Sequence, residues 1–126
     1  MKVLALDYGA ARTGVAVSDA TGTLARPLTV VSGDVVERVA ELVREEGVDL
    51  VVVGLPLTLR GEKGAQARST EGFVGRLRAV LDVPVETYDE RFTTALAGRS
   101  PGGRAAEDAR AAAHLLESYL ARLEGR

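Results

Sequence analysis

Apolar and polar positions over the first 31 residues follow the spacing of three β-strands. Residues 2–8 hold a continuous apolar run, which is typical of a central strand buried on both faces. Residues 13–18 and 24–31 alternate between apolar and polar side chains, and Pro27 in the latter run fits an edge strand because proline cannot donate a ladder hydrogen bond. The short connections between these segments predict an antiparallel meander.

The period changes to that of an α-helix after the third strand. Apolar residues recur on one helical face between Asp34, which is predicted to cap the start, and Gly47, which is predicted to end the helix. The remaining elements are predicted in the order strand 50–55, helix 67–81, strand 83–88, short helical segment 93–97 and helix 105–123.

The predicted order is three strands, helix, strand, helix, strand and helix. Right-handed crossover connections place the fourth and fifth strands parallel to the first. The pattern therefore predicts an α/β fold with a mixed five-stranded sheet, three strands antiparallel and two parallel, flanked by helices. This is the element order of an RNase H-like fold, and a single domain over residues 1–126 is expected.

Composition narrows the chemistry that such a domain can perform. The 126 residues include no cysteine and one histidine, so thiolate chemistry and His-rich metal sites are excluded, and a metal ion would need oxygen ligands. The net charge of −2 gives no overall attraction for nucleic acid, which would need a local basic patch. No apolar run is long enough to cross a bilayer, and Met1 leads directly into strand-like sequence, so a cytoplasmic protein with no membrane partner is expected.

Three acidic positions are candidates for a shared site. Asp7 ends the first strand, where α/β sheets hold their ligands. Asp108 lies on the apolar stripe of the last predicted helix, an uncommon place for a carboxylate unless it only serves the helix N-terminus. Asp89 and Glu90 end the fifth strand, and strand alternation sends their side chains to opposite faces, so one of them at most is expected to join Asp7 and Asp108.

Clustered carboxylates of this kind favour Mg²⁺ or Mn²⁺. Both ions prefer hard oxygen ligands and leave coordination positions for water and substrate phosphate. Two such ions about 4 Å apart can activate a water molecule and stabilise the leaving oxygen during phosphodiester hydrolysis. The sequence alone does not show that the strand ends and helix start that carry these acids lie close together, so the proximity of the acids is a hypothesis.

Four segments closely resemble the YqgF family, also called RuvX, of RNase H-like proteins described as pre-16S rRNA nucleases or Holliday-junction-resolvase-like proteins. The segments come in the family's order and span nearly the whole chain. They are LDYG with RTGVAVSD at residues 6–19, VGLPL at 53–57, DERFTT at 89–94, and the spaced pattern D-x-x-AA-x-x-LL-x-x-YL at 108–120. The resemblance is specific because all four occur together, whereas any one of them would be weak.

The resemblance implies a metal-dependent nuclease that processes the 5′ end of pre-16S rRNA in ribosome biogenesis. It implies catalytic and metal-binding roles for Asp7, Glu90 and Asp108, with Glu90 preferred over Asp89 because RNase H-like proteins favour a glutamate there. Arg91 and Thr94 of the same segment are implied either to contact the phosphate backbone of a substrate or to brace the acids. Arg12, beside the Asp7 turn, is a candidate phosphate ligand, although a surface arginine on a hairpin is an equal alternative. The chain departs from the family in its short stretch between Thr94 and Asp108 and in His114, for which a non-catalytic place on the helix flank is expected.

A basic segment offers a second set of substrate contacts. A charged, glycine-rich loop at residues 60–66 is expected to be mobile, and Arg60 and Lys63 within it are candidates to close over a nucleic-acid backbone. Arg76 and Arg78 are expected on the solvated face of the following helix. Tyr8, Tyr88 and Phe92 are the few aromatic residues near the predicted site, so recognition is expected to depend on backbone and shape more than on bases.

Three other functions are compatible with these residues. A Holliday junction resolvase would cut four-way DNA, usually as a two-fold dimer, so the oligomeric state, monomer or homodimer, bears on the substrate. An actin-like ATP-binding half-site is suggested by the spacing of Asp7, Gly9 and Gly14, and would need a second domain or a dimer to enclose ATP. A non-catalytic nucleic-acid-binding adaptor would keep the fold and lose the chemistry.

Overall fold

The computed structural model of the chain describes residues 1–58, 60–92 and 103–124. Its sheet has the strand order β3-β2-β1-β4-β5, with β1, β2 and β3 antiparallel and β1, β4 and β5 parallel. The strands are β1 (Val3–Tyr8), β2 (Thr13–Ser18), β3 (Ala25–Val31), β4 (Leu50–Leu55) and β5 (Val85–Asp89). The helices are α1 (Val35–Glu46), α2 (Ala65–Val80), α3 (Gly103–Leu123) and the 3₁₀ turn η1 (Glu90–Phe92). This architecture confirms the predicted mixed five-stranded sheet.

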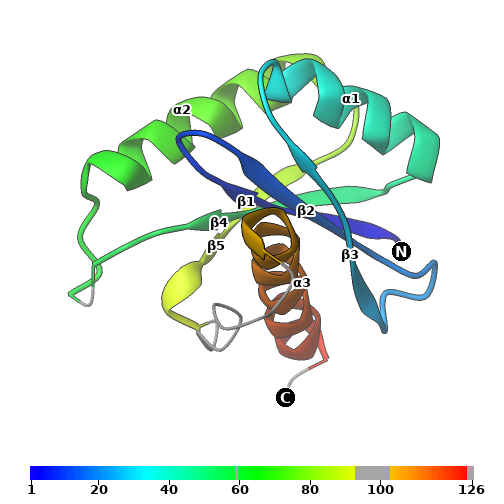
Figure 1. Cartoon of the computed structure of the whole chain (residues 1–126). Coiled ribbons are helices and arrows are strands. Elements are labelled where there is room, and N and C mark those ends of the chain that lie inside the picture. Colours follow the sequence, from blue (N-terminus) through cyan, green and yellow to red (C-terminus); the bar gives the residue numbers. More distant parts are fainter. Residues whose placement is uncertain (59, 93–102, 125–126) are drawn as a thin grey trace.

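Helices cover both faces of the sheet (Figure 1). Helices α1 and α2 lie together on one face, and α3 crosses the other face beneath β1, β2 and β3. The alternation of β1 explains this sandwich, because Leu4 and Leu6 pack toward α1 and α2 while Val3 and Ala5 pack toward α3. A strand buried on both faces is therefore apolar at every position of its first half.

Local predictions agree with the structure at most positions. Pro27 lies in β3, which is an edge strand, and Gly47 ends α1 in the left-handed conformation at φ 64°. Asp34 occupies the N-cap position of α1 as predicted, but its side chain makes no capping hydrogen bond there. The predicted helical segment 93–97 falls outside the described residues.

Several boundaries differ from the sequence prediction by one or two residues. Helix α2 begins at Ala65, β5 runs from Val85 to Asp89, and α3 begins at Gly103. Within the described residues, no helix is both long and apolar enough to cross a membrane.

Candidate active site

Asp7 lies near the carboxyl end of the central strand β1, between an antiparallel neighbour and a parallel one. The pleat of β1 places Asp7 on the same face as Val3 and Ala5, the face covered by α3. The residue is half-buried. Burial raises the pKa of its carboxyl group, a hydrogen bond with Glu90 partly offsets the rise, and the negative charge of Asp108 adds to it.

Glu90 follows β5 directly and reaches across the end of β4 to Asp7. The two carboxyl groups share a hydrogen bond. Burial, together with the charge and hydrogen bond of Asp7, raises the pKa of Glu90 to about 7. Two carboxyl groups this close cannot both ionise without a cost, so the pair holds a proton near neutral pH.

Asp89 has a different environment from its neighbour Glu90. Its carboxylate accepts hydrogen bonds from the Arg91 guanidinium at 2.6 and 2.9 Å and from the Arg91 backbone N–H at 2.9 Å. These contacts lower the pKa of Asp89. The two acids therefore have different partners: Glu90, in the 3₁₀ turn after β5, is turned to Asp7, and Asp89, the last residue of β5, is held by Arg91. The predicted separation is found, but the break in the strand after Asp89, not strand alternation, produces it.

Asp108 comes to the site from α3. Its carboxylate is near enough to raise the pKa of Asp7. The Arg12 side chain, from the β1–β2 turn, forms an ion pair with it at 2.9 Å between Nε and Oδ2. The structure thus brings Asp7 and Glu90 into direct contact and adds Asp108 beside them, with Arg12 bound to Asp108.

Two glycines, Gly14 and Gly54, make this convergence possible. A Cβ atom on Gly14 would lie 2.0 Å from the Asp108 backbone oxygen, so only glycine lets α3 approach β2 directly beside Asp7, which pairs with Gly14 in the sheet register. A Cβ atom on Gly54 would lie 2.8 Å from the Glu90 side chain. Both glycines belong to segments that carry the family resemblance, which was the available signal for them.

The donor chemistry of the site fits a divalent cation. Asp7 and Glu90 supply hard oxygen ligands, and their contact is a like-charged pair that a cation would stabilise in place of the shared proton. Among the residues with described side chains, however, no three acidic or histidine groups are gathered closely enough to hold an ion. The predicted third ligand, Asp108, is bound to Arg12 instead.

The basic loop lies beside these acids and has a defined turn. Leu57 and Lys63 form an antiparallel bridge, and the Gly61 N–H donates to the Thr58 carbonyl at 2.8 Å. A Cβ atom on Gly61 would lie 3.3 Å from the Arg91 guanidinium, so the loop lies against Arg91. The segment expected to be mobile is therefore a hydrogen-bonded turn in its described part.

The predicted substrate-binding residues differ in whether their side chains form ion pairs within the protein. Arg60 is exposed on this loop, whereas Lys63 forms an ion pair with Glu71 at 2.6 Å. Arg91 binds Asp89, and Arg12 binds Asp108. Thr94 lies outside the described residues, so its predicted role stays a prediction.

Residues expected at the margin of the site occupy structural positions. His114 is paired with Glu117 on α3 at 3.3 Å, in agreement with its predicted non-catalytic place. The expectation for Arg78 is wrong in part, because its exposed side chain donates two hydrogen bonds to the Val85 carbonyl, at 2.7 and 3.1 Å, and so ties α2 to β5. Arg76 is also exposed, and lies 5.8 Å from the centre of the Phe73 ring.

The tyrosines near the site are committed to the core. Tyr8 stacks on Phe73 with ring centres 4.1 Å apart, and Tyr88 is buried, with its ring against Tyr119 and its hydroxyl bound to Ser118. Neither ring is free to stack between unpaired bases. This arrangement agrees with recognition through the nucleic-acid backbone.

Comparisons with known proteins agree with this geometry. The sequence model of the RuvX family, described as Holliday junction resolvase, matches residues 1–122. A protein from Rubrobacter xylanophilus is 49% identical, with 94% of this chain and 91% of the relative covered. A protein from Chloroflexus aurantiacus is 44% identical, with coverage of 94% and 85%. Both relatives carry the provisional name pre-16S rRNA nuclease.

Solved structures support the fold assignment. RuvC from Thermus thermophilus, determined in complex with a Holliday junction substrate, superposes with a TM-score of 0.65 at 20% identity. The superposition covers 99% of this chain and 96% of that one. At this identity the likeness concerns the fold, and it agrees with the RNase H-like arrangement of the described elements.

Proposed function

Because the chain belongs to the RuvX family, we propose that it is a divalent-metal-dependent nuclease that hydrolyses phosphodiester bonds at the 5′ end of precursor 16S rRNA. The observation that carries the proposal is the contact between the Asp7 and Glu90 carboxyl groups at the carboxyl ends of β1 and β5. Burial and mutual repulsion oppose the ionisation of both carboxyl groups at once. A bound divalent cation would relieve this repulsion.

Each residue of the site has a distinct role in this proposal. Asp7 and Glu90 hold Mg²⁺ or Mn²⁺, and Asp108 joins them as the third carboxylate. An ion held by these residues would supply the chemistry of water activation and leaving-oxygen stabilisation. Before metal binds, the hydrogen bond to Asp7 orients the Glu90 carboxyl group, and the half-buried position of both groups would strengthen their attraction for a cation that replaces the shared proton.

Basic residues around the acids support a nucleic-acid substrate. Arg60 and Lys63, on the turn beside Arg91, would bind phosphates of the substrate. Thr94, outside the described residues, is a further candidate for a contact with the nucleic-acid backbone on the strength of the family resemblance. The Asp89 carboxylate accepts hydrogen bonds from two N–H groups of the Arg91 guanidinium and so fixes the position of this cation beside the acids. Substrate recognition through phosphates suits a protein whose tyrosines near the site are engaged in packing.

Resolution of four-way DNA junctions is the second candidate function. The description of the matched family, Holliday junction resolvase, is the observation that favours it. Paired cuts across a junction need two active sites related by a two-fold axis, so this function requires a homodimer, whereas rRNA processing is compatible with a monomer.

The test is a cleavage assay with purified protein and Mg²⁺ or Mn²⁺. The substrates are a labelled pre-16S 5′-leader RNA, an unrelated single-stranded RNA and a four-way DNA junction. We expect metal-dependent cleavage of the leader RNA that is lost in Asp7→Asn. Asp49→Asn is the matched control, since it removes the same charge near the opposite end of the sheet and is expected to cleave like the wild type.

Each outcome bears on the assignment. Preference for the junction would replace rRNA processing with resolution, and sedimentation would then be expected to show a dimer. Binding of RNA without cleavage, unchanged in Asp7→Asn, would reject the nuclease and favour the adaptor. Cleavage that persists in Asp7→Asn would reject this set of acids.

A further inference from the structure

The ion pair between Arg12 and Asp108 joins two residues that the proposed nuclease would use for different ligands. Nε of Arg12 lies 2.9 Å from Oδ2 of Asp108, and the two side chains are 32% and 34% exposed. Arg12 comes from the turn after β1, and Asp108 from α3 on the far side of β2. The pair is therefore a tertiary contact at the mouth of the site, accessible to ions and phosphates.

The backbones beneath the two side chains are closely fitted to the sheet. A Cβ atom on Gly9 would lie 2.5 Å from the Arg12 carbonyl oxygen, so the turn that carries Arg12 is tight. A Cβ atom on Gly14 would lie 2.0 Å from the Asp108 carbonyl oxygen. Because both backbones are held in this way, the side chains are the parts free to change partners.

A guanidinium and a metal ion compete for the same carboxylate oxygen. The Arg12 charge is permanent, and its planar fork suits carboxylate and phosphate equally. Bound to Asp108, Arg12 offsets the negative charge that lies beside the Asp7–Glu90 pair. A divalent ion that binds Asp108 replaces that compensation and leaves Arg12 without its partner next to the place where a substrate phosphate would lie.

We propose that Arg12 is a positioning residue that exchanges partners, holding Asp108 while the site lacks metal and turning to a nucleic-acid phosphate once Asp108 binds metal. The inference rests on the proposed nuclease function. It adds a coupling, since metal and nucleic acid would each strengthen the binding of the other, and thermodynamic linkage makes the two effects equal.

Calorimetric titration with Mn²⁺, in the absence of nucleic acid, tests the first half of the exchange. Arg12→Gln is expected to bind Mn²⁺ about fivefold more tightly than the wild type, because Asp108 no longer has a competing partner. In the Asp108→Asn background the same substitution is expected to change Mn²⁺ affinity very little. Arg110→Gln is the matched control, since it removes the same charge two residues from Asp108 and is expected to have a much smaller effect.

Fluorescence anisotropy with labelled leader RNA tests the second half. With Ca²⁺ in place of the reactive metal, wild-type RNA affinity is expected to rise severalfold over its value in EDTA. Arg12→Gln is expected to lose most of this rise, and Arg12→Lys, which keeps the charge without the fork, to retain part of it. The lysine variant also guards against a folding defect in the glutamine variant.

The outcomes separate this inference from the function on which it rests. An equal gain of Mn²⁺ affinity in both backgrounds, or from Arg110→Gln, would reduce the effect to general electrostatics and overturn the exchange. Intact coupling without cleavage of any substrate would reject the nuclease and keep the exchange. A wild type that binds no Mn²⁺ would overturn both.

Discussion

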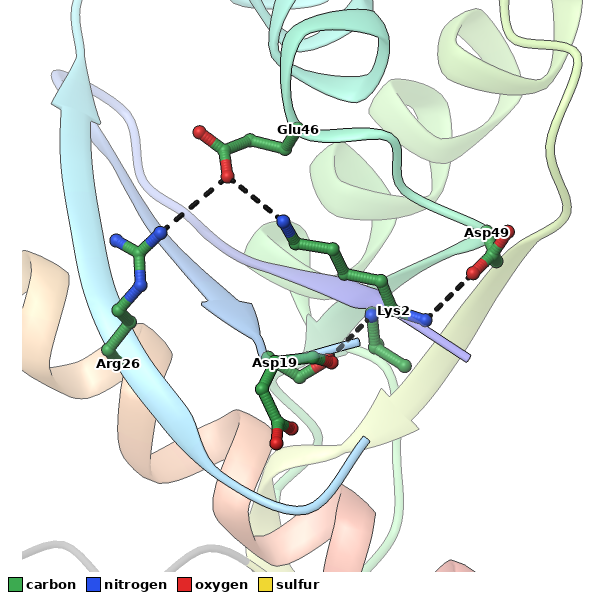
Figure 2. A network of polar contacts seen from close by, with 7 residues as sticks. Lys2, Asp19, Arg26, Glu46 and Asp49 are labelled. Atoms are coloured by element: carbon green, nitrogen blue, oxygen red, sulfur yellow. Dashed lines mark hydrogen bonds and ion pairs between the residues drawn. The ribbon is translucent and has the colours of Figure 1, made fainter. Parts of the chain in front are cut away.

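The two ends of the sheet differ in how their acidic side chains are paired. At the start of β1, unlike charges alternate: Glu46 accepts contacts from Lys2 at 3.3 Å and Arg26 at 3.6 Å, and Asp49 accepts the Lys2 backbone N–H at 2.8 Å (Figure 2). At the other end of β1, two acidic groups, the carboxyl groups of Asp7 and Glu90, are in contact. The first arrangement is complete within the chain, while the second needs a proton or a cation from outside.

Two aspartates show the same contrast in their titration. The Asp19 carboxylate, near the start of β1, accepts hydrogen bonds from the Thr21 hydroxyl and from backbone N–H groups, which lower its pKa to about 2. Burial raises the pKa of Asp7 instead. A carboxylate surrounded by donors serves the fold, and one buried beside other acids is suited to bind a cation. The following predictions test this division, beginning with the largest expected effect.

Glu90→Gln is expected to lower the cleavage rate about a hundredfold or more, because it replaces a proposed metal ligand with a neutral amide of the same shape. Asp89→Asn is the neighbouring control, and is expected to cost much less because Asp89 acts through Arg91. Initial rates at saturating Mg²⁺ would compare the two variants. The reverse order of losses would make Asp89 the ligand and Glu90 the support.

Gly14→Ala is expected to lower the free energy of unfolding by about 3 kcal/mol or more, since the added methyl group meets the Asp108 backbone oxygen and must displace α3. Gly72→Ala, at an exposed position in α2 with nothing within 4 Å of the new atom, is expected to stabilise by about 0.5–1 kcal/mol. Urea denaturation would measure both. Equal stability of Gly14→Ala and the wild type would show that α3 is not packed against β2 at this point.

The sequence predicts which face of its strand or helix a site residue occupies better than it predicts what that residue contacts. Helical spacing places Asp108 on the side of α3 that faces the sheet, because this depends only on local periodicity. Only one of Asp89 and Glu90 contacts Asp7, as expected, although Glu90 lies in η1 beyond the end of β5. The roles of Gly14 and Gly54 depend on what lies across the sheet from them. Local patterns carry no such information.

Contacts between residues that are far apart in the sequence cannot be predicted from local patterns either. Arg12 is a plausible surface residue of a hairpin until α3 brings Asp108 to it. Arg78 fits a solvated helix face until β5 presents the Val85 carbonyl. In each case the tertiary fold, not the local segment, chooses the partner of a long and adaptable side chain.

The carboxyl pair predicts a characteristic pH dependence of stability. The folded protein holds a proton on Glu90 up to a pKa of about 7, whereas the unfolded chain loses it near the ordinary value of 4.5. This contribution is complete below about pH 4.5, declines as the pH rises to about 7 and is absent above it. Between pH 5 and 8 the wild type is therefore expected to lose stability relative to Glu90→Gln in urea denaturation, and parallel curves would contradict the shared proton.

The smallest expected effect lies at the other end of the sheet. Glu46→Gln removes the charge that pairs with Lys2 and Arg26 and keeps the shape of the side chain. Arg26 is 60% exposed, so solvent weakens its pair, and the loss of stability is expected to be at most about 1 kcal/mol and to shrink as salt is added. Cleavage is expected to stay at the wild-type rate, because the complementary charges here have no part in binding metal or phosphate. A change in Mn²⁺ affinity comparable to that of Arg12→Gln would show that the two ends of the sheet are not electrostatically independent, and the division between a structural end and a catalytic one would fail.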